Sequence, residues 1–228
     1  MDQNTGFTRD NWWGGTTAID YSFRRAPGFF DVVNYLGTDS AQTLNHNLGA
    51  VPELMIVKSR TSGGWVVYSA ATGNTKSTFL SSDDAFGNSP TDWNNTTPTA
   101  TQLTIGSNLS TSGHSFIAFL FATLSGISKV GSYTGTGNDI DVDCGFTAGA
   151  RFVLVKRTDS TADWLYFDTL RGIVSGNESA FPMNDNTGGN GIFNVDYIDP
   201  LSTGFTITSS APASLKASGG SYIFLAIA

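Results

Sequence analysis

Short apolar stretches alternate along the chain with clusters of glycine, asparagine, aspartate and serine. Residues 102–105 and 205–208 alternate polar and apolar side chains, which is typical of a half-buried strand. The apolar runs 54–57, 65–68 and 116–122 are too short for stable helices and lack helical spacing, so they predict strands that are covered on both faces or lie at an interface. The clusters between the runs have the composition of turns. The pattern therefore predicts an all-β protein of the β-sandwich or jelly-roll type.

The same apolar blocks occur twice along the chain, in the same order. The blocks and their counterparts are 33–38 with 131–136, 54–58 with 152–156, 65–68 with 164–167, 102–105 with 204–207, and 115–119 with 221–225. Matched blocks in one order indicate an internal duplication. We therefore expect two tandem jelly-roll-like sandwiches, with an N-terminal arm over 1–31, a first sandwich over 32–123, a linker over 124–129 and a second sandwich over 130–228.

The arm resembles the last strand of a repeat whose other strands are absent. Residues 21–23 align with 119–121, near the end of the first copy. Because a free edge strand favours aggregation, we expect residues 18–23 to complete a sheet in a neighbouring chain, or sequence upstream of this chain to be missing. Large aromatic residues of the arm are the candidates for oligomerisation: Trp12, Trp13, Tyr21, Phe23, Phe29 and Phe30.

Charge and cysteine content exclude several kinds of partner and site. The chain has 12 basic and 19 acidic residues, and it has no cluster of lysine and arginine that could bind a phosphate backbone, so we expect no nucleic-acid partner. Its single cysteine, Cys144, excludes an internal disulfide and a thiolate zinc site. The longest apolar run, 116–122, is far shorter than the ~20 residues that span a bilayer. Since residues 1–15 also lack a secretory signal, we expect no membrane insertion.

One acidic segment is a weak candidate for binding a metal ion. Asp139, Asp141 and Asp143 alternate on one face of a predicted strand, and three stacked carboxylates could hold Ca²⁺. The EF-hand pattern fails, however, because Cys144 and Ala150 replace its glycine and its last glutamate. A solvated strand face is therefore the favoured interpretation.

The two histidines and the absence of catalytic motifs argue against an enzyme. His46 takes the place that Cys144 has in the second copy, which favours a packed structural position. His114 lies between a glycine and a serine and is expected in an exposed turn. No nucleophile elbow, Walker loop or H-E-x-x-H motif occurs. We therefore expect no enzyme and no cofactor.

Several segments of both copies resemble a known family. In the first copy they are 26–31, 35–38, 46–49 and 52–54, and in the second copy they are 143–152, 197–200 and 221–228. Together they are similar to the C-terminal repeat region of phage tail-fibre and related virion appendage proteins, and the resemblance extends over residues 21–228. It implies a structural virion component that is usually distal and often trimeric, and it supplies no catalytic residues.

The resemblance and the residues together lead to one expected function. We expect a phage tail fibre or similar appendage that adheres to a host-surface glycan or protein. By this resemblance it forms a homo-oligomer, a trimer, together with other virion proteins, and it is assembled in the host cytoplasm and then becomes extracellular in the virion. Two alternatives stay open, namely a capsid-decorating or spacer protein without a ligand, and a tail-associated polysaccharide depolymerase.

Aromatic residues in predicted loops are the candidates for binding a glycan. Trp93 with Asn94 and Asn95 in the first copy, and Tyr197 with Asp199 in the second, combine a ring that can stack on a sugar with polar groups that can bond its hydroxyls. The alternative, which is favoured, is that both rings fill the ends of the sandwiches. Two other aromatic residues at equivalent strand positions, Trp65 and Trp164, are expected to pack in the core.

Overall fold

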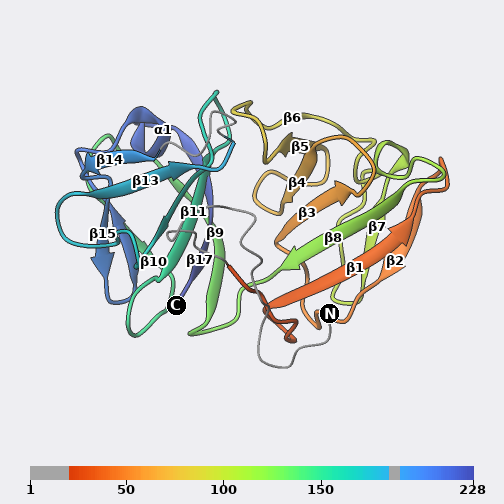
Figure 1. The fold of residues 1–228 in the computed structure, drawn as a ribbon, viewed down its shortest axis with the longest axis horizontal. Coiled ribbons are helices and arrows are strands. Elements are labelled where there is room, and N and C mark those ends of the chain that lie inside the picture. The colour runs from red at the N-terminus through yellow and green to blue at the C-terminus, as the bar shows by residue number, and fades with distance from the viewer. Residues whose placement is uncertain (1–20, 185–190) are drawn as a thin grey trace, which may run out of the picture.

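A computed structural model describes residues 21–184 and 191–228, and these residues form an almost entirely β protein (Figure 1). The first half contains β1 (Phe30–Leu36), β2 (Gln42–Asn45), β3 (Leu54–Ser59), β4 (Trp65–Ser69), β5 (Lys76–Phe79), β6 (Gly87–Asn88), β7 (Gln102–Ile105), the 3-10 helix η1 (Ser107–Leu109) and β8 (Ser115–Phe121). Its strands form a six-stranded antiparallel sheet, in the order β1-β8-β3-β4-β5-β6, and a small sheet of β2 and β7.

The second half repeats this arrangement with one additional strand. It contains β9 (Ser128–Thr134), β10 (Ile140–Asp143), β11 (Phe152–Arg157), β12 (Leu165–Asp168), β13 (Glu178–Pro182), β14 (Ile192–Val195), β15 (Ile198–Leu201), β16 (Gly204–Ile207), the short helix α1 (Ala213–Lys216) and β17 (Ser221–Ile227). Its large sheet has the order β14-β13-β12-β11-β17-β9, and its small sheet has the order β10-β16-β15. No helix in the described part of the chain is long and apolar enough to cross a membrane.

Both large sheets have the same strand order when the copies are matched from β1 with β9 to β8 with β17. In each half the large sheet packs on the small sheet and encloses its own apolar core. The predicted all-β fold with tandem sandwiches is therefore confirmed. A duplication would produce this shared topology, although the evolutionary origin of the two halves stays a prediction.

An equivalent tyrosine ties the first strand of each half to the turn before the last strand. Tyr35 stacks on Phe116 with ring centroids 5.0 Å apart, and its hydroxyl donates to the backbone oxygen of Leu109 at 2.8 Å. In the second half, Tyr133 stacks on Tyr222 at 4.8 Å, and its hydroxyl donates to the carbonyl of Leu215, also at 2.8 Å. Both bonds satisfy carbonyls at helix ends, where intrahelical partners are missing; the first is buried and the second is partly buried.

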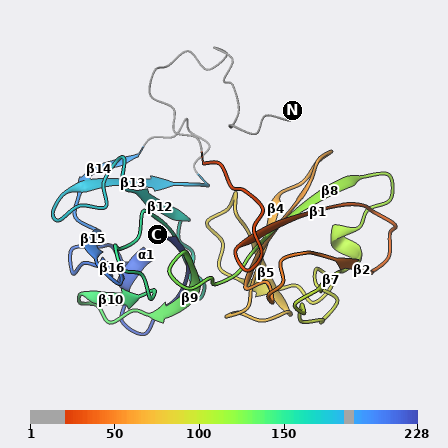
Figure 2. The ribbon, with the colours of Figure 1, turned by 90° about the horizontal axis from the view of Figure 1, so that it is seen from below.

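A third apolar core lies between the halves, where the outer faces of the two large sheets meet. Leu54 and Ile56 of β3 and Phe121 of β8 lie on one side, and Phe152 and Leu154 of β11 lie on the other. Figures 1 and 2 show the halves side by side along this contact. The expectation that the run 54–57 is covered on both faces is confirmed, because its other face contributes to the core of the first sandwich.

The segment that precedes β1 crosses the contact between the halves (Figure 2). Tyr21 packs edge-on against Phe152 with centroids 5.0 Å apart, and its hydroxyl donates to Asp168 Oδ2 at 2.5 Å. Phe23 packs against Phe30 and Phe121, at 5.5 Å from each ring. Residues 21–23 are therefore held by their own chain and are not a strand. Pairing of this segment with a neighbouring chain stays a prediction, and residues 18–20 lie outside the described residues.

Candidate functional site

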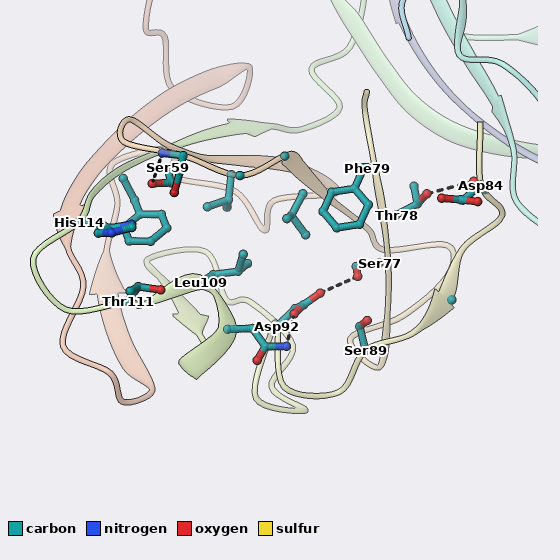
Figure 3. A pocket seen from close by; sticks show the side chains of 18 of the residues that line it. Ser59, Ser77, Thr78, Phe79, Asp84, Ser89, Asp92, Leu109, Thr111 and His114 are labelled. Atoms are coloured by element: carbon teal, nitrogen blue, oxygen red, sulfur yellow. Dashed lines mark hydrogen bonds between the residues drawn. The ribbon is translucent and has the colours of Figure 1, made fainter. Parts of the chain in front are cut away.

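A cavity of about 650 Å³ opens at one end of the first sandwich (Figure 3). Its apolar floor is made by inward-facing residues of the core, among them Val57, Val66 and Phe116. Figure 3 shows His114 and Thr111 at one end of the cavity and Asp84 near the other. Polar groups from separate loops thus converge over an apolar base, which is the usual make-up of a small-molecule site.

Asp92 forms the most firmly held polar wall of the cavity. It is buried, and its Oδ2 accepts the hydroxyl of Ser77 at 2.6 Å while its Oδ1 accepts the side-chain amide of Asn108 at 2.9 Å. The backbone N–H of Gly106 donates to the carbonyl of Asp92 at 2.8 Å. A Cβ at Gly106 would lie 1.8 Å from the oxygen of Thr91, so only glycine permits this approach of the two segments. These bonds fix the carboxylate before any ligand arrives.

An exposed aromatic ring borders the same cavity. Phe79, the last residue of β5, lines the cavity and is 44% exposed. Gly64 lies beneath it, since a Cβ there would come within 2.5 Å of the Phe79 ring. The hydroxyl of Thr78 donates to the carbonyl of Asp84 at 3.0 Å and holds the next loop against β5. The cavity therefore combines a carboxylate and hydroxyls with a ring on which a ligand could stack.

The structure corrects the sequence-based choice of Trp93 as a ligand-binding ring. Trp93 is fully buried, packs against Tyr68 with centroids 5.5 Å apart, and donates its indole N–H to the carbonyl of Lys76 at 3.1 Å. Its ring therefore cannot stack on a sugar, and the favoured alternative, a ring that fills the end of the sandwich, is confirmed for this residue. The neighbouring side chain of Asp92 is the one that lines the cavity.

The other predicted ligand residues do not come together in one place. Asn94 and Asn95 are exposed and have positive φ angles of 49° and 51°, and they do not line the cavity. Tyr197 and Asp199 belong to the second half and are half-buried. Tyr197 packs against the core there, and Asp199 Oδ1 accepts the N–H of Gly176 at 3.2 Å. The two sets of candidates thus lie in separate halves, and neither set lines the cavity.

His46 and Cys144 are buried, whereas His114 lines the cavity. His46 is buried, its Nδ1 accepts the N–H of Leu48 at 3.3 Å, and its Nε2 bonds the carbonyl of Thr99 at 3.1 Å, so the predicted structural role is confirmed. Cys144 is also buried, and burial raises the pKa of its thiol to about 12. His114 is half-buried and lines the cavity, so its assignment to an exposed turn was wrong.

The structure gives no support to the weak calcium candidate. Asp141 Oδ1 accepts the hydroxyl of Thr206 at 2.7 Å, Asp143 Oδ1 accepts the N–H of Gly145 at 2.8 Å, and Asp139 bonds the N–H of Ser209. Within residues 21–184 and 191–228, no group of three or more histidine, cysteine or acidic side chains is arranged to hold a metal ion. The three carboxylates are exposed and bond separate local donors, as expected for a solvated strand face.

Three of the six candidates for oligomerisation line an apolar groove of about 350 Å³ on the large sheet of the first half. Tyr21, Phe23 and Phe30 line it together with Trp65 and Phe119. Trp65 stacks on Phe119 and is 37% exposed, so the expectation that it packs in the core was wrong. The equivalent Trp164 is buried as expected, because the first half covers it. Phe29 is half-buried beside Phe30, while Trp12 and Trp13 lie outside the described residues.

The fold and the cavity define the class, an all-β protein of two sandwiches, the first of which has a preformed cavity with an apolar floor and polar groups around it. The chain belongs to the family described as Domain of unknown function (DUF7483), which matches residues 11–228. No curated protein and no solved structure matches the chain. Because the family description assigns no activity, a function has to be inferred from the geometry.

Proposed function

We propose that this protein is a non-enzymatic component of a virion appendage and that it binds a host-surface glycan in the cavity of the first half. The observation that carries the binding role is the cavity itself. The carboxylate of Asp92 lines it and is held by Ser77, and the exposed ring of Phe79 lies at its rim. Sugars present apolar C–H faces beside hydroxyl groups, and this lining matches both.

The polar lining suits a ligand with many hydroxyl groups. Each oxygen of Asp92 already accepts one hydrogen bond, from Ser77 or Asn108, and a carboxylate oxygen has a second acceptor site. The hydroxyl groups of Ser89 and Thr111 add groups that can both donate and accept. Because the carboxylate is already oriented, little conformational entropy is lost when the ligand binds.

The place in a virion is supported by the resemblance of residues 21–228 to tail-fibre repeats and by the architecture. Each half encloses its own core, and a third core joins them without any disulfide. A rigid, β-rich body of this kind suits a protein that functions outside the cell. Assembly into a homo-oligomer, a trimer by the resemblance, belongs to the same proposal, and the apolar groove beside Trp65 supports it.

The depolymerase alternative also has one observation in its favour. Two carboxylates, those of Asp84 and Asp92, line the same cavity, and glycoside hydrolysis uses a pair of carboxylates on either side of the scissile bond. Both oxygens of Asp92 are already held by Ser77 and Asn108, and the sequence adds no catalytic motif to this pair of carboxylates. Binding without cleavage is therefore the better supported role.

The test is binding of the purified chain to an array of bacterial surface polysaccharides. We expect Phe79→Ala to weaken binding by roughly tenfold or more, because the stacking surface is lost. The matched control is Phe193→Ala, which removes an exposed ring of the second half and should leave binding unchanged. Absence of binding to every polysaccharide would favour the spacer, and release of reducing ends would establish the depolymerase.

A further inference from the structure

One wall of the cavity is a loop whose side away from the cavity is hydrogen-bonded to the second half. Residues 79–87 run from the end of β5 to β6 and contribute Phe79, Asp84 and Gly87 to the lining. In Figure 1 this part of the first half faces the turn between β11 and β12. The loop therefore has a ligand-facing side and a side that meets the second half.

Three hydrogen bonds join this loop to the β11–β12 turn. The indole N–H of Trp164 donates to the carbonyl of Phe79 at 3.0 Å. The N–H of Ala162 donates to the carbonyl of Asp83 at 2.8 Å, and the N–H of Phe86 donates to the carbonyl of Thr158 at 3.0 Å. Bonds at both ends and in the middle of the loop leave it little freedom to move away from the second half.

Lys156 adds a buried positive charge to this contact. Its side chain is fully buried, its Nζ donates to the carbonyl of Asp83 at 2.8 Å and to the carbonyl of Ala162, and it lies 6.0 Å from the centre of the Trp164 ring. A buried ammonium is costly unless it is hydrogen-bonded. Lys156 therefore stabilises the loop only in the position in which the carbonyl of Asp83 reaches it.

The equivalent lysine of the first half serves a different purpose. Lys58 is half-exposed, and its Nζ donates to the carbonyl of Gly63, 2.7 Å away in the turn that follows its own strand. The matched positions thus hold lysines in both halves, and of the two only Lys156 donates a hydrogen bond to a described residue of the other half. This makes Lys58 an internal control for the loss of a lysine from the same strand position.

We propose that Lys156 and Trp164 are positioning residues for the cavity, so that the second half sets the shape and the ligand affinity of a site in the first half. This inference rests on the proposed function as far as the ligand is a glycan. The positioning of residues 79–87 is a separate statement and can be tested without any ligand. The second half thereby acquires a role beyond that of a spacer.

The proposal has a pH signature. Burial lowers the pKa of Lys156 to about 8 from an ordinary value of 10.5, against the opposing effect of the carboxylates that face it: Asp83 and Asp84 from the loop and Asp163 from the turn. Between pH 8 and pH 10.5, Lys156 thus holds fewer protons when residues 79–87 are docked against it than when they have moved away. By linkage, docking becomes more favourable as the pH rises from about 8, by at most tenfold per pH unit for one proton.

The first experiment is hydrogen exchange of residues 79–87 in the intact chain. We expect Lys156→Met to raise exchange in this segment by roughly tenfold, since the hydrogen bond from the buried ammonium to the carbonyl of Asp83 is lost, while Lys58→Met leaves exchange unchanged. After correction for intrinsic rates, protection should increase between pH 8 and 10 in the wild type and in Lys58→Met, but not in Lys156→Met. Unchanged exchange in Lys156→Met would overturn the proposal, as would identical pH profiles.

A second variant keeps the proposal testable if Lys156→Met fails to fold. Trp164→Phe retains a ring but removes the N–H that bonds Phe79, and it should raise exchange in the same segment. Unchanged exchange in this variant would contradict the role of Trp164.

The binding experiment separates the two proposals. With a polysaccharide that the wild type binds on the array, Lys156→Met should weaken affinity by roughly tenfold. The control here is Lys216→Met, which removes a lysine that bonds the carbonyl of Gly137 away from the cavity and should bind normally. If Lys156→Met raises exchange in residues 79–87 but leaves the affinity for the polysaccharide unchanged, the proposed role of Lys156 in positioning the cavity is wrong. The proposal that the cavity binds a glycan is not affected by that result. If the wild type binds no polysaccharide, the proposed function fails, and the exchange data alone decide whether the second half holds the wall.

Discussion

At the scale of the single residue, Glu178 stands out as an acid that is only 4% exposed. Its Oε1 accepts the N–H of Tyr197 at 2.8 Å, whereas Oε2 has no hydrogen-bond partner among the described residues. Burial raises the pKa of this carboxyl to about 7, and the neighbouring carboxylates of Asp196 and Asp199 add to the increase. Near neutral pH the side chain thus exchanges its proton inside the folded protein.

The raised pKa predicts how Glu178 affects stability. The folded state holds this proton more tightly than the unfolded state, whose ordinary value is 4.5, so the contribution is fully present below pH 4.5 and is lost as the pH rises through 7. Relative to the wild type, Glu178→Gln should gain about 1–3 kcal/mol of unfolding free energy between pH 5 and pH 8. Urea unfolding of the variant and the wild type at pH 5 and at pH 8 measures this change in unfolding free energy, and Glu53→Gln is the matched control. An equal difference at the two pH values would contradict the assignment.

At the scale of the element, the strands were predictable where the apolar pattern was strong. Residues 54–57 and 116–122 fall within β3 and β8 or at its end, because both faces of these strands are covered and the run is therefore continuous. Strand β15 was missed, since Pro200 within 197–200 has the composition of a loop. Pro200 is tolerated because β15 is the edge strand of its sheet.

Two equivalent glycines allow the first strand of each half to approach the turn before its last strand. A Cβ at Gly37 would lie 1.9 Å from the carbonyl oxygen of Thr111, and one at Gly135 would lie 2.1 Å from that of Ala217. We expect Gly37→Ala and Gly135→Ala each to lower the unfolding free energy by about 1–3 kcal/mol, because the backbone has to shift. Thermal or urea unfolding measures the loss.

Gly87→Ala is the matched control, since a Cβ at Gly87 has no neighbouring atom within 4 Å and its φ angle is not positive. Its effect should be small. Equal losses in all three variants would show that removing a glycine, and not the close approach, is responsible.

At the scale of the whole molecule, the pattern left open whether the apolar strands are covered by a second layer or lie at an interface. Both are true, because the large sheets share a core between the halves. The cavity could not be predicted, since its groups come from positions as distant as Ser77, Asp92, Asn108 and His114. Aromatic residues in loops were the available signal, and that signal pointed to Trp93, whose ring is in the core.

The shared core predicts that the halves unfold together. Leu154→Ala leaves a cavity between the halves and should lower the unfolding free energy by about 2–4 kcal/mol. Circular dichroism and tryptophan fluorescence should nevertheless follow one coincident transition in urea. Leu103→Ala, within the core of the first half, is the comparison and should shift the same single transition. Two separate transitions in the wild type would show that the halves are independent.

The course of residues 21–23 has a mechanical consequence. A pull on the chain ahead of Tyr21 reaches the second half through Asp168 and Phe152, and it reaches the first half through the contacts of Phe23. A force applied at that point therefore acts on both halves at the same time, and neither half has to detach before the force reaches the other.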